Sequence, residues 1–485
     1  MSVTNSLANA LTGLSAAARR AEVVSSNISN ALTDGYGRRE INLSSQSLAG
    51  NGAGVRVEGV TRIVDMGVVQ DRRLADASLG DANTRAGFYN RLEALTGSPD
   101  APGSLSDRIA RFESSLLEAA SRPDADVRLQ NVVSAAKGLV SQVNAISAEV
   151  QSARMDADRA IGLQVDELNN ALQQVRDLNV DIARQKASGY DANALMDQRQ
   201  QTVDRIASLV PIRQVPREND QIALFSPGGA ILLDGNPALI GFAPAGVITP
   251  DMTQASGALS GLTLNGIAYD TSAAGSRLAG GSLIGQFAVR DELAVAAQTQ
   301  IDAVARDLVS RFQGPAVDPT LGPASAGLFT DSGAFFDAAN EEGLAGRLSL
   351  NATVDPALGG DLWKLRDGVN AIAPGEVGNA AQLQRLSGAL TGLNVPASGG
   401  LTTAARTLSG LASDFLSAIG GARQAAEADG TYARLQSDTF RATELQNGVD
   451  TDYEMQQLLL VEAAFAANAK VLQAADDMIQ TLLGL

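Results

Sequence analysis

The sequence contains no cysteine and no histidine among its 485 residues. Without cysteine there are no disulfides and no thiol nucleophiles, and without histidine there is no Ser-His-Asp triad and no histidine proton shuttle. Zinc sites built from thiolates or imidazoles are excluded as well. The remaining residue types form no catalytic constellation, so we expect no enzyme activity, no metal and no cofactor. A chain without cysteine suits a reducing cytosol or export in an unfolded state.

Aromatic residues and positive charges are also scarce. Aromatics make up 4% of the chain, and 37 Lys and Arg residues face 54 Asp and Glu residues, which leaves a net charge of −17. Alanine-rich helices with few aromatics favour elongated bundles over one thick core. Because nucleic-acid binding requires basic groups that neutralise phosphates, we expect no nucleic-acid partner.

Long apolar runs are missing too. No stretch of about 20 uninterrupted apolar residues occurs, so we expect no membrane insertion. The N-terminus lacks a basic region followed by an apolar core and a cleavage site, so we expect no cleavable signal peptide.

Each end of the chain carries an apolar residue at every seventh position. The N-terminal stripe is Leu7, Leu14, Ala21 and Ile28, with Val3, Ala10, Ala17, Val24 and Ala31 at the alternate seam positions. The C-terminal stripe is Leu458, Phe465, Leu472 and Ile479, with Val461, Asn468, Ala475 and Leu482 between them. A strict seven-residue period is typical of a coiled-coil seam. We therefore expect the two terminal helices to meet.

Two interpretations of these stripes remain open at this point. They are either two helices of an ordinary intramolecular bundle or a surface for assembly with other molecules, and the period alone favours neither. Asn468 also allows two interpretations. It is either a tolerated polar residue near solvent or a device that sets the register of the seam at a cost in stability.

The chain between the stripes reads as helices interrupted by β structure. Val3 to Leu32 predicts one helix that Asp34-Gly35 stops. The glycines of 50–54 precede the alternating strand Val55–Glu58 and predict a hairpin turn. A phosphate-binding loop would need a helix directly after the glycines, and a strand follows them instead.

Further along, helical periodicity covers 61–210, with breaks near 97–99 and 188–190 and a long helix over 128–186. Residues 211–282 predict a β-rich region, 283–312 a helix, and 314–375 an irregular segment. Helices resume near 380, with a break at 394–400. The expected fold is mainly α with a smaller β part: an elongated antiparallel helical bundle with paired terminal helices and a β-rich side region.

This pattern suggests three parts. Residues 1–33 and 449–485 would form the terminal heptad helices. Residues 34–313 and 376–448 would form a rod-like helical domain with a β-hairpin and the β-rich insert at 211–282. Residues 314–375 would form a short outer segment or a reduced domain.

The start of the last helix carries a cluster of polar residues. Thr451 and Glu454 have capping-box spacing, in which the hydroxyl accepts from an orphan amide and the carboxylate reaches back. A calcium loop is the alternative, since Asp450, Asp452 and Glu454 alternate, but it lacks the required Gly at the sixth position and Glu at the twelfth.

Several motifs resemble the bacterial flagellar rod, hook and hook-associated proteins. The N-terminal signature comprises Ser26, Asn27, Asn30, Gly35, Tyr36 and Arg38. Residues 54–57 and 60–62 resemble the strand that follows it in this family, and residues 193–199, 285–291 and 448–472 resemble its hook-associated members. Asp34, Gly37 and Arg39 depart from the usual Pro, Ser and Gln, and we expect them to alter only the details of a turn.

The resemblance implies a structural protein that leaves the cell unfolded through the flagellar type III export channel. It implies self-assembly in a ring or helical lattice at the hook–filament junction, with the hook protein and a second junction protein as partners. The terminal helices would line the axial channel and be disordered in the free monomer, and the C-terminal helix would dock an export chaperone. The short interval at 314–375 implies a small or absent outer domain.

Two other functions remain open from the sequence. One is a different axial component of the flagellum, and the other is a cytosolic coiled-coil scaffold or binding protein whose terminal helices bundle internally.

Overall fold

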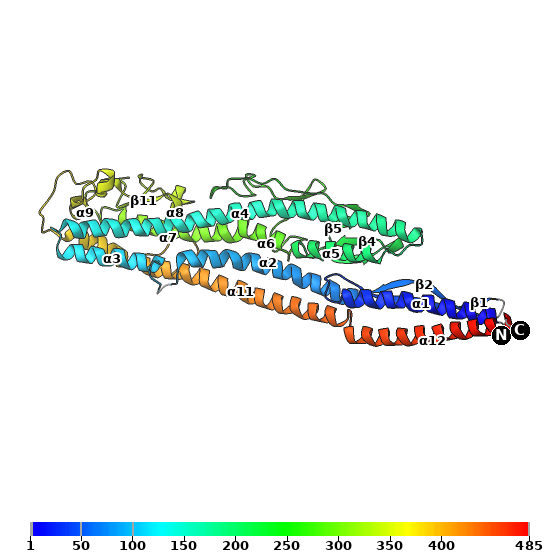
Figure 1. Ribbon diagram of the computed structural model, residues 1–485. Coiled ribbons are helices and arrows are strands. Elements are labelled where there is room, and N and C mark those ends of the chain that lie inside the picture. Colours follow the sequence, from blue (N-terminus) through cyan, green and yellow to red (C-terminus); the bar gives the residue numbers. More distant parts are fainter. Residues whose placement is uncertain (1–2, 49–50, 99–100, 484–485) are drawn as a thin grey trace. The chain divides into compact units, whose positions relative to one another are not determined.

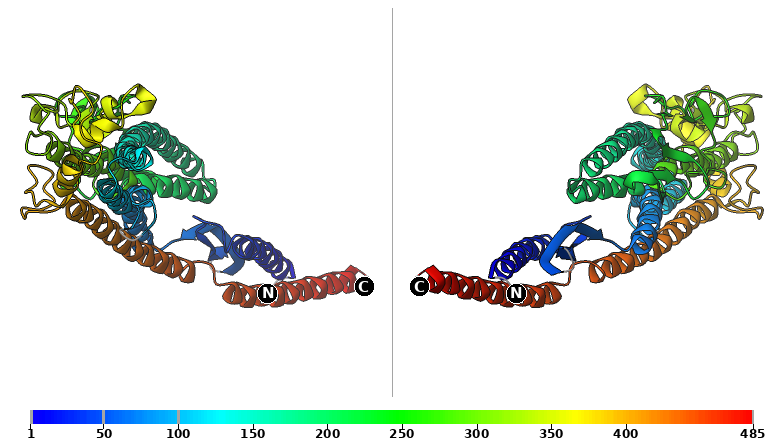
Figure 2. Two further views of the ribbon diagram at one scale, coloured as in Figure 1. Left: turned by 90° about the vertical axis from the view of Figure 1, so that its left-hand side faces the viewer. Right: turned by 90° about the vertical axis from the view of Figure 1, so that its right-hand side faces the viewer.

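The computed structural model describes residues 3–48, 51–98 and 101–483, which form two compact units. Unit 1 comprises Met1–Leu79, Glu167–Leu239 and Tyr432–Leu485, and unit 2 comprises Gly80–Asp166 and Ile240–Thr431. Both units are mainly helical with small antiparallel sheets (Figure 1; Figure 2). The predicted fold class, mainly α with a smaller β part, is confirmed.

Long helices supply most of the structure. They are α1 (Val3–Ser29), α2 (Met66–Thr96), α3 (Leu105–Ser121), α4 (Asp126–Ala187), α5 (Asn193–Leu209), α7 (Ala294–Phe312), α10 (Ala381–Thr391), α11 (Leu408–Gln446) and α12 (Thr451–Leu483). The breaks predicted near 97–99, 188–190 and 394–400 all fall between these helices. The apolar residues that predicted the long helix at 128–186 are buried along α4, because they recur on one face of it.

In unit 2, one core joins α3, α4, α7, α10 and α11. Phe112, Phe312 and Phe329 pack together in it, with ring centroids 5.2 to 6.1 Å apart. Phe329 lies in the segment 314–375, which therefore shares this core. The segment's elements are β10 (Phe329–Asp331), β11 (Leu348–Leu350), α8 (Leu344–Arg347), α9 (Trp363–Asp367) and the 3₁₀ turns Ala338–Asn340, Ala352–Val354 and Pro356–Leu358.

The β-rich region expected at 211–282 is confirmed, but it divides between the two units. Unit 1 holds β3 (Arg213–Pro216), β4 (Ile222–Phe225), β5 (Ile231–Asp234) and β6 (Asn236–Pro237), paired in that order, with a 3₁₀ turn at Glu218–Asp220. Unit 2 holds β7 (Ile240–Gly241), β8 (Leu262–Leu264) and β9 (Ile267–Tyr269). All the pairings are antiparallel.

In unit 1, a two-stranded hairpin packs against α1. Its strands are β1 (Arg38–Leu48) and β2 (Asn51–Ile63), so the predicted hairpin is confirmed. Residues 49 and 50, between the two strands, lie outside the described residues. Gly52 and Gly54 lie within β2 rather than in the turn that the sequence predicted.

Also in unit 1, α5 runs antiparallel to the end of α4, as the sequence predicts. Arg199 donates to Asn179 Oδ1 at 2.8 Å, and Arg205 donates to Gln174 Oε1 at 2.8 Å. Burial lowers the pKa of Arg199 to about 10.

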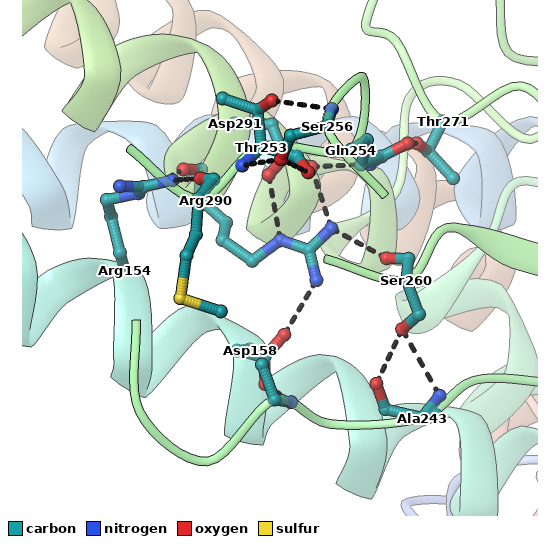
Figure 3. Close-up of polar contacts among 12 residues, drawn as sticks. Arg154, Asp158, Ala243, Thr253, Gln254, Ser256, Ser260, Thr271, Arg290 and Asp291 are labelled. Atoms are coloured by element: carbon teal, nitrogen blue, oxygen red, sulfur yellow. Dashed lines mark hydrogen bonds and ion pairs between the residues drawn. The ribbon is translucent and has the colours of Figure 1, made fainter. Parts of the chain in front are cut away.

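A fully buried arginine ties the β structure of unit 2 to α4 (Figure 3). Arg290 lies in the π-helical turn Val289–Leu293, which joins α6 (Ser282–Ala288) to α7. Its guanidinium contacts Asp158 of α4 at 2.6 Å and Asp291 at 2.9 Å, and donates to Ser260 O at 2.8 Å. It also lies over the ring of Phe287, 4.9 Å from the centroid. Because the charge of Arg290 is buried, losing the carboxylate of Asp158 or Asp291 would leave it without a counterion.

Arg154 extends the same cluster (Figure 3). Its guanidinium donates to the carbonyl oxygens of Arg290, Thr249 and Met252 at 2.5 to 3.1 Å. These bonds satisfy backbone groups of an irregular loop that lacks a strand partner. The loop 242–261 is thereby held against α4.

We predict that Arg290→Met lowers the free energy of unfolding of unit 2 by about 4 kcal/mol, because Asp158 and Asp291 lose their buried counterion. Fluorescence of Trp363, the one tryptophan of the sequence, reports this unfolding in a denaturant titration. Arg159→Met is the matched control, since Arg159 follows Asp158 in α4 and pairs with Asp156 at the surface, 3.1 Å away. The control should lose less than about 1 kcal/mol. Equal losses in the two variants would contradict the role given to Arg290.

A second buried charge in unit 2 joins α7 to α8. The carboxylate of Asp302 accepts the N–H groups of Gly343 and Ala345, each at 2.8 Å, and Nε2–H of Gln298 at 2.9 Å. Burial nevertheless raises the pKa of Asp302 to about 6, and the neighbouring carboxylate of Glu341 acts in the same direction.

This raised pKa predicts a pH-dependent stability. The folded-state pKa lies above the unfolded value of about 4, so the contribution of Asp302 is complete below pH 4 and is lost as the pH rises through 6. Between pH 4 and 7.5 the wild-type free energy of unfolding should fall by about 3 kcal/mol more than that of Asp302→Asn, which cannot ionise. Parallel pH profiles for the two proteins would be the contrary result.

Candidate functional site

The terminal helices α1 and α12 lie side by side and antiparallel in unit 1 (Figure 1). Asn27 Nδ2 donates to Glu454 Oε1 at 3.1 Å, and Arg20 Nη2 donates to Gln457 Oε1 at 2.6 Å. The pairing that the heptads predict is therefore present within one chain. Small and medium apolar residues form its buried line, namely Ala10, Ala17 and Val24 on α1 and Val461 and Ala475 on α12.

The predicted seam residues divide into three groups by burial. Val24 and Val461 are buried, and Phe465 is exposed. The half-buried residues are Leu7, Leu14, Ile28, Leu458, Asn468, Leu472 and Ile479. Leu482 lies in α12, but its side chain is outside what the structure describes. The pairing thus covers the smaller residues and leaves the larger ones partly open.

A second apolar row runs along the outer side of α12. Its members are Tyr453, Leu460, Val471 and Met478, with 45%, 60%, 46% and 48% of their surface exposed. They are 7, 11 and 7 residues apart, close to whole numbers of helical turns, so they share one face. The row lies outside the seven-residue seam predicted from the sequence, and its 11-residue step between Leu460 and Val471 breaks the strict heptad period.

The hydropathy of the C-terminal helical region, Leu408–Thr481, is also high. Within Leu408–Thr481 a window of mean hydropathy 1.4 is apolar enough, by length and composition alone, to cross a membrane, and 11% of that window is buried.

The family-motif residues converge at the point where α1 ends and α12 begins. Asn27 is 1% exposed, and its amide makes four contacts. Nδ2 donates to Arg39 O at 2.8 Å and to Glu454, while Oδ1 accepts from Arg39 N and from Tyr36 Oη, both at 2.9 Å. One side chain therefore links the end of α1, the first residues of β1 and the first turn of α12.

The neighbouring motif residues support this contact. Ser26 Oγ lies 3.2 Å from Tyr36 Oη, and burial raises the pKa of Tyr36. Asn30 Nδ2 donates to Ser26 O at 2.9 Å. Gly35 adopts a φ of +78°, and a Cβ there would lie 2.7 Å from Gln201. The turn therefore requires glycine at this position.

Arg38 joins the turn to α12. Its guanidinium is 5.7 Å from the ring centroid of Tyr453 and 3.6 Å from Glu454 Oε1. Arg38, one of the N-terminal signature residues, thus contacts the helix that carries the outer apolar row.

The capping box predicted for Thr451 and Glu454 is wrong. The cap is Asp450, one residue earlier, and its Oδ1 accepts from the N–H groups of Asp452 at 2.9 Å and Tyr453 at 3.1 Å. Glu454 does not reach back along its own helix, because its buried carboxylate bonds Asn27 and pairs with Arg38. Spacing alone cannot separate the two arrangements, since both place an acid in the first turn.

Asp197 of α5 also contacts the turn that follows α1. It contacts Arg39 at 3.0 Å and Arg62 at 2.7 Å, and it accepts the N–H of Gly37 at 3.0 Å. Asn193 of the same helix donates to Val60 O of β2 at 2.9 Å. These two residues belong to the 193–199 motif, so the N-terminal motif and the α5 motif form one connected polar cluster.

We predict that Asn27→Ala destabilises the docking of α12 on α1 by about 3 kcal/mol, since four hydrogen bonds are lost and Glu454 stays buried. Amide hydrogen exchange over residues 451–461 should accelerate accordingly. Asn30→Ala removes only local hydrogen bonds, to Ser26 O and from Thr33 Oγ1, and serves as the control. Unchanged exchange in Asn27→Ala would show that the amide does not hold α12.

Comparison with known proteins identifies three matching families along the chain. The helical domain of flagellar hook-associated protein FlgK matches residues 89–314. A family of flagella basal body rod proteins matches residues 7–36, and the C-terminal part of flagellar basal body rod FlgEFG proteins matches residues 446–485. The last two ranges hold the motif turn with α1 and the whole of α12.

Curated relatives carry the same description. Flagellar hook-associated protein 1 of Bacillus subtilis (strain 168) is 27% identical over 250 residues, which cover 48% of this chain and 49% of that protein. Its counterpart in Salmonella typhimurium (strain LT2) is 30% identical over 237 residues, which cover 47% of this chain and 42% of that protein. The chain thus spans less than half the length of the curated relatives that it matches.

A solved structure, that of the flagellar hook junction protein FlgK from Burkholderia pseudomallei, is similar over 54% of this chain and 46% of that chain, with a TM-score of 0.43 and 23% identity. The matched families are structural rather than enzymatic, and their members are components of the flagellum. With an N-terminal, a central and a C-terminal match in the expected order, the chain belongs to the family of bacterial flagellar hook-associated proteins.

Proposed function

We propose that this chain is a junction adaptor that joins the flagellar hook to the filament by self-assembly. The observation that carries the proposal is the exposed apolar row of Tyr453, Leu460, Val471 and Met478 on α12, next to the buried line of Val461 and Ala475 that faces α1. Removing such a row from water is favourable, and although Arg38 of β1 lies over the ring of Tyr453, the side chains of Leu460, Val471 and Met478 remain 46% to 60% exposed. The row is therefore available to a neighbouring subunit.

A second copy of the chain is the partner that the geometry favours. If the outer row of one subunit packs against a different surface of the next, the heterologous contact produces rings or helical lattices. Glu462 and Lys470 are exposed charges on α12 and interrupt its apolar composition, which favours a protein neighbour over lipid.

The finer assignments rest on the family. We propose that residues 1–33 and 449–485 form the inner tube and that their pairing stays only marginally stable until neighbours pack against it, since isolated helices of this kind are marginal. Residues 34–313 and 376–448 would form the wall of the junction, with 314–375 at its outer side. The proposed partners are the hook protein, the second junction protein and an export chaperone at the C-terminal helix.

The proposed location is the extracellular flagellum, reached by type III export in an unfolded state. The absence of cysteine suits that route, because no disulfide has to form or break on the way.

The direct test is microscopy of cells that lack this protein. The proposal expects bare hooks without filaments, restored by the full chain. Normal filaments in the deletion strain would overturn the junction assignment and favour a different axial component or a cytosolic scaffold. Deletion of residues 449–485 should likewise abolish chaperone binding and filament attachment.

The outer row gives a sharper prediction. Leu460→Asp and Val471→Asp should prevent assembly while shifting the monomer melting temperature by less than about 2 °C, because both side chains are already largely in water. Sedimentation measures the assembly, and calorimetry measures the melting temperature. Gln473→Asp, an exposed residue on the polar side of α12, is the matched control and should assemble normally. A large loss of monomer stability in the Leu460 variant would place this residue in a core instead.

A further inference from the structure

We infer that Gly13 of α1 and Asn468 of α12 set the register of the terminal helix pair. The inference rests on the proposed function in one respect, because the register decides which residues of α12 form the outer row. Its physical basis is a close approach of the two helices at a single point of the seam.

The approach is too close for any side chain at position 13. A Cβ built on Gly13 would lie 2.7 Å from Asn468 Oδ1 and 2.9 Å from Asn468 Cγ. Gly13 has ordinary helical geometry inside α1, so the backbone does not need glycine there. Glycine in a helix interior costs about 1 kcal/mol relative to alanine, and the space it opens for Asn468 offsets that cost.

The amide of Asn468 is held in a fixed orientation. Its Nδ2 donates to Ala464 O, one turn back on α12, at 2.9 Å. All three heavy atoms of the amide, Oδ1, Cγ and Nδ2, would lie 2.7 to 2.9 Å from a Cβ at position 13. A half-buried polar side chain aligned in this way fits one position on the opposite helix better than the apolar positions around it.

The spacing of the polar contacts identifies the preferred register. Asn27 meets Glu454, and Gly13 meets Asn468, and these two contacts are 14 residues apart on both helices. Both therefore lie in one heptad phase, two heptads from each other. Between and beyond them the buried line consists mainly of alanine and valine, which tolerate a shift because their shapes are similar.

A shift by one heptad would break the polar contacts and leave the apolar ones largely intact. Asn468 would then face Arg20 or Ser6, and Gly13 would face Val461 or Ala475. The alanine-rich seam does not oppose such a shift, whereas the Gly13–Asn468 contact does. This contact therefore selects one register of the α1–α12 pair while adding little to the stability of the pair.

The residue before Gly13 fixes the other side of α1. Thr12 Oγ1 accepts the N–H of Val55 at 3.3 Å, and a Cβ on Gly54 would lie 2.0 Å from that oxygen. Gly54 has a φ of +96°, so its own conformation also favours glycine. Residues 12 and 13 thus hold α1 against the hairpin and against α12 at one level.

Disulfide cross-linking measures the register directly, because the native chain has no cysteine. One cysteine replaces Ala17, which lies between Gly13 and Arg20. The second replaces Gln457, Ala464 or Val471 in turn, three positions that are seven residues apart. The parent should cross-link about ten-fold more at 464 than at 457 or 471, because 464 lies between the contacts of Gln457 and Asn468.

Two variants test the role of the contact. Asn468→Leu, which has nearly the same shape, should keep the helices paired but spread the cross-links over the three positions. Gly13→Ala should reduce the yield at 464 about ten-fold, although alanine raises helix propensity. The exposed Ser15→Ala is the control for propensity and should keep the single cross-link. Adding Asn468→Ala to Gly13→Ala removes the clash and should restore helix pairing, but the cross-links should spread over the three positions, because the contact that sets the register is gone.

A single cross-link at 464 in both Asn468→Leu and Gly13→Ala would overturn the inference, and so would equal yields at all three positions in the parent. Failure of the proposed function is distinguishable. If the parent chain cross-links only at 464 but cells that lack the protein still attach filaments, the register contact stands and the junction assignment is wrong.

Discussion

The buried amide of Asn27 is the contact on which the rest of unit 1 depends. It is bonded to the turn after α1 through Tyr36 and Arg39 and to the first turn of α12 through Glu454. Breaking these hydrogen bonds would leave buried polar groups without partners, so the three segments keep one arrangement. Because residues 27 and 454 are over 400 positions apart in sequence, this contact brings the two ends of the chain together.

The terminal pair that results is only half covered. Small residues such as Ala17 and Ala475 lie inward and let the helices approach closely, while Leu460, Val471 and Met478 stay in water. Burying large apolar side chains contributes more free energy than burying alanine, so most of the available gain is left for contacts between subunits. Such a division suits a protein that is carried as a monomer and becomes stable in a lattice.

Much of the fold was predictable because heptads, glycine breaks and β-rich composition are local signals. The helix ends near 97 and 188, the buried face of α4 and the pairing of α1 with α12 follow from such patterns. The polar cluster around Asp197 and the buried ion pairs of Arg290 were not predictable, since their partners come from distant segments and no spacing rule relates them. The capping error at Thr451 has the same origin, because Asn27 and Arg38 of a remote segment take the carboxylate of Glu454.

The central claim is that neighbouring subunits cover the outer row of α12. A single cysteine at position 460 tests it most directly, because the chain has no other thiol and the alkylation rate reports access of water to that site. Our account predicts that the rate in the assembled junction falls more than about ten-fold below the rate in the free monomer, while a cysteine at Gln473 changes little. Equal rates at position 460 in the monomer and in the assembled protein would contradict it.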